Sequence, residues 1–262
     1  MAPASSANLG PGFDALGLAV DLPFRVGFEG DPAEETHPAV VAFRSWGGQG
    51  PLSCRSPIPP GRGLGFSAAA RVAGLGAAVV QRGEDLDAVR HDLFCRAAEL
   101  EGHPDNAAPS VFGGLTVCAG DTAIRVPVAI DAVVVAWVPA QGSTSTAKSR
   151  AALPQQVPFT DAVFNIGRSA LLLAALTTGD ADALSAATDD RLHQQQRLTR
   201  VPESRAALTH LRDRTLAAWL SGSGPTVAAL ARRDELADLE EGLPDGRLLV
   251  LDIDTTGVHL ER

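Results

Sequence analysis

The sequence is poor in cysteine, in long apolar runs and in positive charge, and each shortage narrows the class of protein. Three cysteines occur, at Cys54, Cys95 and Cys118. These cysteines are odd in number, and they lack both the CxxC spacing of redox sites and the ligand spacing of zinc sites. Such a set is typical of a reducing compartment, where a thiol serves as a small buried apolar group. We therefore expect neither a disulfide framework nor a cysteine metal site.

Long apolar runs are also missing. The nearest, Ala170–Leu176, is far shorter than the roughly 20 residues that a membrane-spanning helix needs. The opening segment Met1–Ser6 lacks the basic stretch and apolar core of an export signal. We therefore expect a cytoplasmic protein with no membrane partner.

Positive charge is scarce, because 22 lysines and arginines stand against 31 aspartates and glutamates, for a net charge of −9. A surface that binds nucleic acid needs an excess of basic side chains, so we expect no nucleic-acid partner. A nucleotide remains compatible with this balance, since one triphosphate needs only a local group of backbone N–H donors and a cation.

The 262 residues are enough for two modest hydrophobic cores, and strand and helix patterns alternate in irregular order, which predicts an α+β fold. The continuous apolar run Ala132–Val138 predicts a strand that is buried on both faces. Small and polar residues over Pro139–Ser145 predict a boundary between two domains, residues 1–140 and 141–262. The expected strands are Ala15–Val20, His37–Phe43, Leu115–Cys118, Ala123–Val126, Ala132–Val138, Thr215–Leu220, Thr226–Leu230, Leu248–Ile253 and Val258–Leu260. The expected helices are Ser67–Gln81, Leu86–Glu101, Ala147–Ala152, Ala162–Thr178, Ala181–Gln196, Glu203–Asp213 and Asp234–Glu241.

The most specific feature is a glycine-rich loop, Pro59-Pro60-Gly61-Arg62-Gly63-Leu64-Gly65, which opens into the expected helix Ser67–Gln81. Glycines at alternate positions allow positive φ angles and close approach of N–H groups to an anion. The start of the helix adds free N–H groups and the positive end of its dipole. The loop therefore predicts a phosphate site, although it has neither a Walker Lys-Ser/Thr pair nor a dinucleotide fingerprint. Taken alone, it is more simply explained as an ordinary helix start.

Two further turn-rich clusters accompany this loop, Pro3–Asp14 near the start and Trp219–Thr226 near the end. Three such clusters in this order resemble the three motifs of the GHMP kinases, and their residues are most similar to those of the homoserine kinases in that family. The resemblance spans nearly the whole chain. Further matches are Glu101–Asn106, Asp161–Asn165, Ser145-Thr146 with Arg150 and Leu153-Pro154, and His193 with Arg197.

The resemblance implies a fold of two halves. The N-terminal half is expected to be like domain 2 of ribosomal protein S5 and the C-terminal half like ferredoxin, with the last strand packed on the N-terminal half. It also implies transfer of the γ-phosphoryl group of ATP, with Mg²⁺, to the side-chain hydroxyl of L-homoserine in threonine biosynthesis. The partners are then these small molecules; the oligomeric state stays open, with a homodimer as one alternative.

The same resemblance assigns an amino-acid subsite. Asn8 and Asp14 match residues that meet the substrate ammonium group, whereas Arg150 and Arg197 match residues that bind its carboxylate, to which a planar guanidinium is suited. Gly222 closes the site from the last motif. As alternatives, Asp14 is a turn or cap residue and each arginine is a solvated helix charge.

Four residues match positions near the reacting hydroxyl. Thr146, Asn106 and His103 lie close to it in the family, and Asp105 is a candidate general base because it adjoins Asn106. A structural role for His103 is an equal alternative, and it stays open whether relatives use a base at all.

The nucleotide subsite takes in the loop and the start of the helix. Ser67 and Glu101 match the oxygen ligands of Mg²⁺, a cation that prefers oxygen donors. Ser67 is alternatively a helix cap, and Glu99 competes with Glu101 for the metal role. The residues that match nucleotide-binding positions are Pro59, Pro60, Gly61, Arg62, Gly63, Leu64, Gly65, Phe66 and Ser67.

Two departures from the family pattern leave alternatives open. Phe66 stands where the family loop Gly-Leu-Gly-Ser-Ser has its first serine, and Cys54–Ile58 lacks an asparagine that relatives carry near the nucleotide. The alternatives are a kinase of another small alcohol, such as L-threonine or a mevalonate-type acid, and a nucleotide-binding member with weakened catalysis. An acid together with two arginines favours a zwitterionic amino acid as acceptor.

Overall fold

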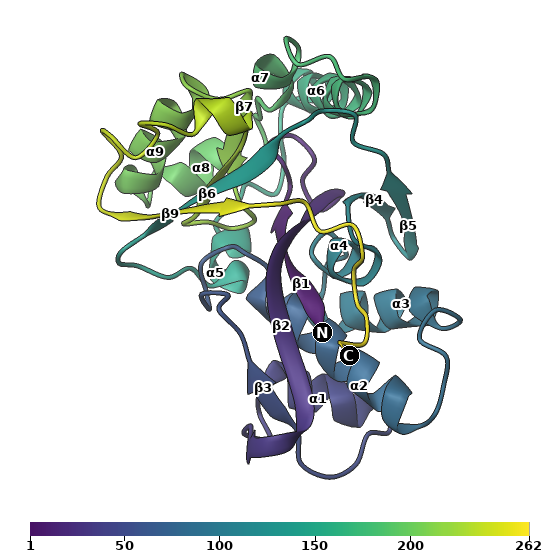
Figure 1. Ribbon diagram of the computed structural model, residues 1–262. Coiled ribbons are helices and arrows are strands. Elements are labelled where there is room, and N and C mark those ends of the chain that lie inside the picture. The colour runs from purple at the N-terminus through teal and green to yellow at the C-terminus, as the bar shows by residue number, and fades with distance from the viewer. Residues whose placement is uncertain (262) are drawn as a thin grey trace.

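Two antiparallel sheets form the framework of the chain, which a computed structural model describes over residues 1–261 (Figure 1). The first sheet has the strand order β1-β2-β4-β5, and β3 pairs with the outer part of β2; the second has the order β7-β8-β6-β9. The strands of the first sheet are β1 (Ala2–Ala7), β2 (Leu16–Pro32), β3 (Ser53–Arg55), β4 (Leu115–Ala119) and β5 (Thr122–Val126). Those of the second are β6 (Val133–Pro139), β7 (Ala217–Leu220), β8 (Val227–Ala231) and β9 (Gly246–Leu251).

Each sheet together with its helices forms one layer of the molecule. In the first layer the central helix is α2 (Phe66–Gln81), which packs on β1 and β2. Its small residues allow close packing: a Cβ on Gly74 would lie only 2.1 Å from the backbone oxygen of Ala39 in α1. The other helices of this layer are α1 (Pro38–Ser45), α3 (Arg90–Glu101) and α4 (Ala107–Phe112). Those of the second layer are α5 (Thr146–Ala151), α6 (Phe159–Thr178), α7 (Leu184–Ala187), α8 (Gln194–Leu198) and α9 (Pro202–Arg212), with a 3₁₀ turn at Arg233–Glu235.

Strand β6 joins the two layers, and all of its residues are buried, as the continuous apolar run predicts. Side chains of a strand alternate between its faces, so Val134 and Ala136 enter the larger core whereas Val135 and Trp137 enter the second core. Both pairing partners of β6, β8 and β9, belong to the second sheet. The predicted boundary at residue 140 groups β6 with the N-terminal part instead, and the division into domains stays a prediction.

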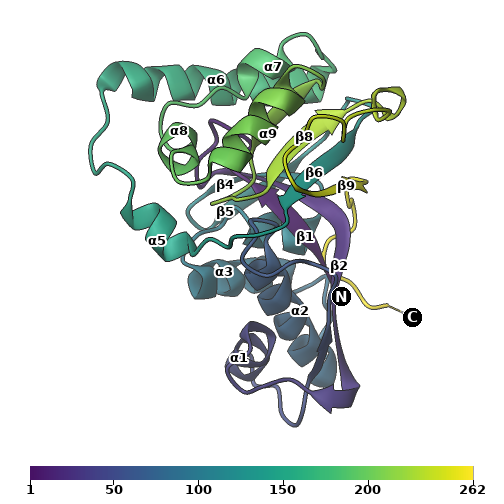
Figure 2. The same cartoon turned by 90° about the vertical axis from the view of Figure 1, so that its left-hand side faces the viewer.

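The C-terminal segment returns to the first layer (Figure 2). Ile253 bridges to Val20 of β2, the N–H of Val258 donates to Val111 of α4, and His259 exchanges hydrogen bonds with Met1. The expected strand Val258–Leu260 is wrong, because this segment pairs as an irregular chain.

Three further element predictions differ from the structure. The expected strand His37–Phe43 is helix α1, because His37 Nδ1 accepts the N–H of Ala39 and Pro38 occupies the first turn. The expected helix Ala181–Gln196 is broken into α7 and α8 around Asp190, whose carboxylate binds the backbone N–H groups that a continuous helix would use. The expected helix Asp234–Glu241 shrinks to the 3₁₀ turn.

Among residues 1–261, α6 is the one helix that is long and apolar enough, by length and composition alone, to cross a membrane. The sequence analysis predicts this helix over Ala162–Thr178, but its test for a membrane span rested on the shorter apolar run Ala170–Leu176. In the structure α6 is tied to its neighbours by polar contacts. Asp161 pairs with Arg191, Arg168 with Asp189, and Asn165 donates to the carbonyl of Pro11.

Candidate active site

The glycine loop has the backbone that its sequence predicts. Gly61, Gly63 and Gly65 have φ angles of 67°, 83° and 67°. Gly65 is the N-cap of α2, and no side chain of the described residues caps the helix, so the N–H groups of its first turn are free to bind an anion. Ser67 is therefore inside the helix and is not its cap.

The last motif holds this loop in place. Ser221 Oγ donates to the carbonyl of Gly63 at 2.6 Å, and the N–H of Thr226 donates to the carbonyl of Arg62 at 3.2 Å. A Cβ on Gly63 would lie 2.4 Å from the oxygen of Ser221, so only glycine allows this approach.

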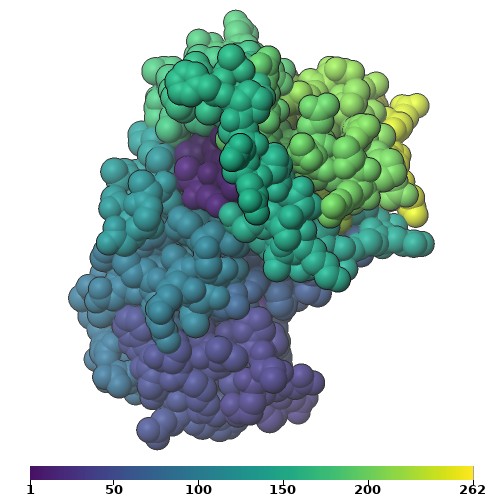
Figure 3. All heavy atoms as spheres, turned by 180° about the vertical axis from the view of Figure 1, so that it is seen from behind, coloured from purple at the N-terminus to yellow at the C-terminus, as the bar shows by residue number. Residues whose placement is uncertain are grey.

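A cleft opens beside the loop, between the two layers. Figure 3 shows the hollow, with the N-terminal residues in purple at its floor and later segments in teal around it. The cleft gathers most of the predicted site residues, whereas Pro59, Pro60, Arg62 and Leu64 do not line it. Its lining residues are Asn8, Asp14, Gly61, Gly63, Gly65, Phe66, Ser67, Ala68, Glu101, His103, Asp105, Asn106, Thr144, Thr146, Arg150, Arg197, Gly222 and Ser223.

Two of the four loop residues outside the cleft have clear structural roles. Leu64 is 1% exposed in the core. Arg62 donates through Nη1 to the carbonyls of Pro139 and Gln141, at 2.5 and 3.0 Å. Arg62 therefore fixes the segment that leads from β6 into α5.

Asp14 and the two predicted arginines all line the cleft. Arg150 binds both carboxylate oxygens of Asp14, at 2.6 and 2.7 Å, and this pairing raises the pKa of Arg150. Both guanidinium groups lie over the Phe13 ring, 5.1 Å from its centre for Arg150 and 5.2 Å for Arg197. Asn8 and Asp14 have positive φ angles of 71° and 58°, a strained backbone that is typical of functional sites.

Arg197 is 6% exposed, and burial, aided by the charge of Arg150, lowers its pKa to about 10. Its Nη1 donates to the carbonyl of Gly222 at 2.9 Å and to His193 Nδ1 at 3.1 Å. Its Nε is buried and has no partner among residues 1–261. A donor left unmatched in this way is costly unless a ligand fills it.

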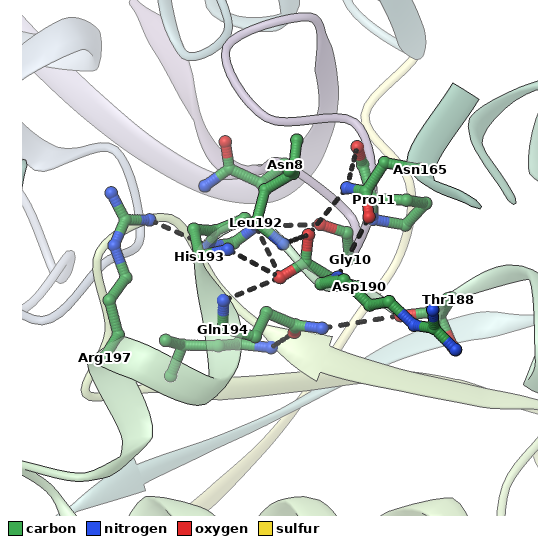
Figure 4. A network of polar contacts seen from close by, with 12 residues as sticks. Asn8, Gly10, Pro11, Asn165, Thr188, Asp190, Leu192, His193, Gln194 and Arg197 are labelled. Carbon is green, nitrogen blue, oxygen red and sulfur yellow. Dashed lines mark hydrogen bonds and ion pairs between the residues drawn. The ribbon is translucent and has the colours of Figure 1, made fainter. Parts of the chain in front are cut away.

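A buried polar network around α8 holds Arg197 (Figure 4). Asp190 accepts the N–H groups of His193 and Gln194 at 2.9 and 2.7 Å and the amide of Asn165 at 2.7 Å. Burial alone raises the pKa of Asp190, but His193 and these donors hold it below its usual range. His193 Nε2 donates to the carbonyl of Gly10 at 2.8 Å, which leaves Nδ1 to accept from Arg197. Burial lowers the pKa of His193, so the ring is neutral.

His103, Asp105 and Asn106 form a second polar group at the floor of the cleft. His103 Nδ1 lies 2.9 Å from Asp105 Oδ1, and their side chains are 11% and 4% exposed. Asn106 Nδ2 donates to the same oxygen at 3.3 Å, and its Oδ1 accepts from Ser5 Oγ at 2.8 Å. Asn106 is thus locked between β1 and Asp105.

The two predicted metal ligands lie side by side. Ser67 Oγ and Glu101 Oε1 both contact Nη1 of Arg71. Glu101 Oε1 is buried and forms an ion pair with Arg71. Glu99 is instead a surface residue that pairs with Arg96, which favours Glu101 as the carboxylate of the site.

Sequence reasoning missed several residues that shape this site. Thr144, whose N–H donates to Gly61 and whose Oγ1 lies 3.2 Å from Ser223 Oγ, carries no recognisable signal. Asp190 has one, because an acid just before a short helix is a common partner of free N–H groups. Arg71 lies one helical turn after Ser67, a spacing that puts two side chains on the same face.

Comparison with known proteins gives the family. The GHMP kinases N terminal domain model matches residues 37–114, and the GHMP kinases C terminal model matches residues 172–245. The chain is 39% identical to the homoserine kinase of Rhodococcus opacus, over 96% of this chain and 93% of that one. It is 40% identical to a homoserine kinase of Thermus thermophilus, over 96% and 94%. The crystal structure of homoserine kinase from Cytophaga hutchinsonii has the same fold, with a TM-score of 0.81, 24% identity and coverage of 98% and 94%. The chain belongs to the homoserine kinases of the GHMP kinase family.

Proposed function

We propose that the chain transfers the γ-phosphoryl group of ATP to the side-chain hydroxyl of L-homoserine and so forms O-phospho-L-homoserine. One observation carries this proposal: Asp14, Arg150 and Arg197 line the same cleft as the uncapped start of α2. The three charged residues suit an amino-acid substrate, and the helix start has the donors of a phosphate site.

The three charged residues support a zwitterionic acceptor. The carboxylate of Asp14 suits an ammonium group, and the unpartnered Nε of Arg197 suits a carboxylate. A mevalonate-type acid has no ammonium group to match Asp14. We propose that the substrate inserts its two charges into the ion pair that Asp14 and Arg150 make with each other.

Asn8 has a supporting role in this proposal. Its Nδ2 donates to the carbonyl of Gly222 at 3.1 Å, and its Oδ1 accepts the N–H of Asp14 at 3.1 Å. Asn8 therefore positions Asp14 and Gly222, and one lone pair of Oδ1 is left for the substrate ammonium group.

The phosphate site fits the loop. The free N–H groups at Ser67 and Ala68 and the dipole of α2 stabilise phosphate charge. Phosphoryl transfer passes through a loose transition state, so positioning contributes more than bond-making chemistry by the protein. We therefore propose that Thr146, Asn106 and His103 orient the reacting hydroxyl and that Asp105 holds His103 in place.

Ser67 and Glu101 fit a magnesium ion. Both offer oxygen atoms to one position, which Nη1 of Arg71 now contacts. When bound there, Mg²⁺ would offset the charge of the ATP phosphates.

Phe66 favours an intact loop over a weakened one. Its ring packs edge-on against Phe24 at 5.4 Å and against His37 at 6.2 Å. The ring thus joins an aromatic cluster with β2 and the start of α1. This position supports an active enzyme in spite of the missing serine.

A coupled assay of ADP release with L-homoserine, L-threonine and mevalonate tests the proposal. We expect release with L-homoserine and much slower release with the other two. Preference for L-threonine or mevalonate would point to another small-alcohol kinase. ATP binding without release on any acceptor would point to a binding protein.

Family membership also supports three further expectations, which we propose here. The reaction belongs to threonine biosynthesis, the enzyme is cytoplasmic, and a homodimer is one alternative for its oligomeric state. Sedimentation velocity of the full chain distinguishes a homodimer from a monomer.

A further inference from the structure

Arg71 of α2 lies one helical turn beyond Ser67, so its side chain reaches back over the residue four positions earlier. Its Nη1 donates a hydrogen bond to Ser67 Oγ and pairs with Glu101 Oε1. The two oxygen ligands of the proposed metal site therefore already contact one cation, which belongs to the protein itself.

The setting of this pair makes the contact persistent but exchangeable. The side chain of Glu101 is 9% exposed and that of Arg71 is 22% exposed. A buried carboxylate without a partner is strongly unfavourable, so Glu101 keeps Arg71 until another cation replaces it. Burial also lowers the pKa of Arg71, so water stabilises this guanidinium less than it does at the surface, and a long flexible stem allows it to turn toward solvent.

We propose that Arg71 competes with the divalent cation for Ser67 and Glu101 and thereby sets the metal affinity of the site. The inference rests on the proposed function, which assigns Mg²⁺ to these oxygens. Magnesium holds its oxygen ligands at roughly 2.0–2.1 Å in a near-ideal octahedron. A guanidinium nitrogen on the same two oxygen atoms occupies that space, so Arg71 leaves when the metal binds.

Direct metal binding tests this competition. Mn²⁺ alone is titrated into the full chain, and the free ion is measured by electron paramagnetic resonance. We expect Arg71→Met, which keeps the aliphatic stem, to bind Mn²⁺ about tenfold more tightly than the wild type, because the loss of a partly buried ion pair corresponds to roughly that factor. Arg71→Gln is a second variant with the same expectation, should Arg71→Met not fold by circular dichroism.

Two controls sharpen the measurement. Arg96→Met removes an exposed ion pair, with Glu99 on the same helix as Glu101, and we expect it to leave Mn²⁺ affinity unchanged. Adding Glu101→Gln to Arg71→Met should abolish the gain, because the gain requires the freed carboxylate.

Equal Mn²⁺ affinity in the wild type and in both Arg71 variants overturns the proposal, and so does a gain that survives Glu101→Gln. ADP release with L-homoserine is measured on the same samples at saturating Mg²⁺. Activity with unchanged Mn²⁺ affinity rejects the role of Arg71 and keeps the kinase function. Tighter Mn²⁺ binding without ADP release keeps the role of Arg71 and rejects the kinase function.

Discussion

Arg197 combines burial, a lowered pKa and a donor without a partner. Its Nη1 is fixed by Gly222 and His193, whereas Nε has no partner in the described part of the chain. A guanidinium held in this way is pre-organised, so little side-chain freedom is lost when a carboxylate binds. This arrangement supports a role in acceptor binding and not in nucleotide binding.

We expect Arg197→Ala to raise KM for L-homoserine far more than KM for ATP. Loss of a charge-assisted hydrogen bond costs about 2 kcal/mol, which corresponds to a decrease of roughly thirtyfold in kcat/KM for homoserine. Steady-state kinetics with each substrate varied in turn measure both constants. A similar rise in both would contradict the assignment, and Arg191→Ala, an exposed arginine that pairs with Asp161, serves as the control.

Phe66→Ser, which restores the family residue, should lower stability without raising activity. The Phe66 ring is part of the cluster with Phe24 and His37, so its removal costs packing energy of about 2 kcal/mol for a half-buried ring. Urea denaturation and ADP release measure the two effects. A marked gain in activity would show that the phenylalanine impairs the loop.

At the scale of elements, the start of α2 couples sequence to function most directly. Gly65 ends the loop at φ 67°, and a Cβ there would lie 2.1 Å from Ser5 Oγ and 3.1 Å from Asn106 Oδ1. The helix start is thus fitted against β1 and against the polar group on the floor of the cleft.

Gly65→Ala should therefore weaken nucleotide binding. Strain at a positive φ angle and the clash with Ser5 displace the first turn, and we expect ATP affinity to fall by about tenfold or more. Calorimetry with a non-hydrolysable ATP analogue measures this. Gly83→Ala is the matched control: Gly83 follows the other end of α2, has φ 71° and has open space around its Cβ position. It should lose about 1 kcal/mol of stability and keep its nucleotide affinity; equal losses in both variants would refute the argument.

Elements and site residues differed in how well the sequence predicted them. Helix α2 was predicted to within one residue, because the glycine loop marks its start. The composition of His37–Phe43 is typical of a strand, but the cap at His37 starts helix α1 there instead. The break at Asp190 depends on a side chain that binds the N–H groups of the next few residues, which helical periodicity does not reveal. The motif residues of the cleft could be predicted one by one. Arg71 could not, since its role follows from the contact between α2 and Glu101 in α3.

For the whole molecule, the α8 network joins the two layers, because neutral His193 links Arg197 to the carbonyl of Gly10. The buried ring of His193 stays neutral in the folded state, whereas the unfolded chain protonates this ring with its ordinary pKa of about 6.5. The contribution of His193 to the free energy of unfolding is therefore fully present above about pH 6.5. It is lost as the pH falls toward the lowered pKa that His193 has in the folded state.

We expect the free energy of unfolding to decrease between pH 6.5 and pH 5, with a slope of up to about 1.4 kcal/mol per pH unit for this one proton. Urea denaturation at several pH values measures the slope. His193→Gln should flatten it, although His37, whose pKa is also lowered by burial, leaves part of it. An unchanged slope in the variant would show that His193 is not the group that titrates. Asp190 does not contribute in this range, because its folded pKa lies below 3.8.

The docking of the glycine loop on the last motif has a consequence for the order of folding. Ser6 and Ser221 are 215 positions apart, and Gly63 and Ser221 are 158 apart, yet their side chains and carbonyls bond directly. Contacts between such distant positions form late, after the shorter loops have closed. A chain emerging from the ribosome therefore cannot complete the cleft until the turn Trp219–Thr226 has been synthesised. A ligand that binds in the cleft therefore stabilises only this finished state, and it favours the last step of folding without speeding the earlier ones.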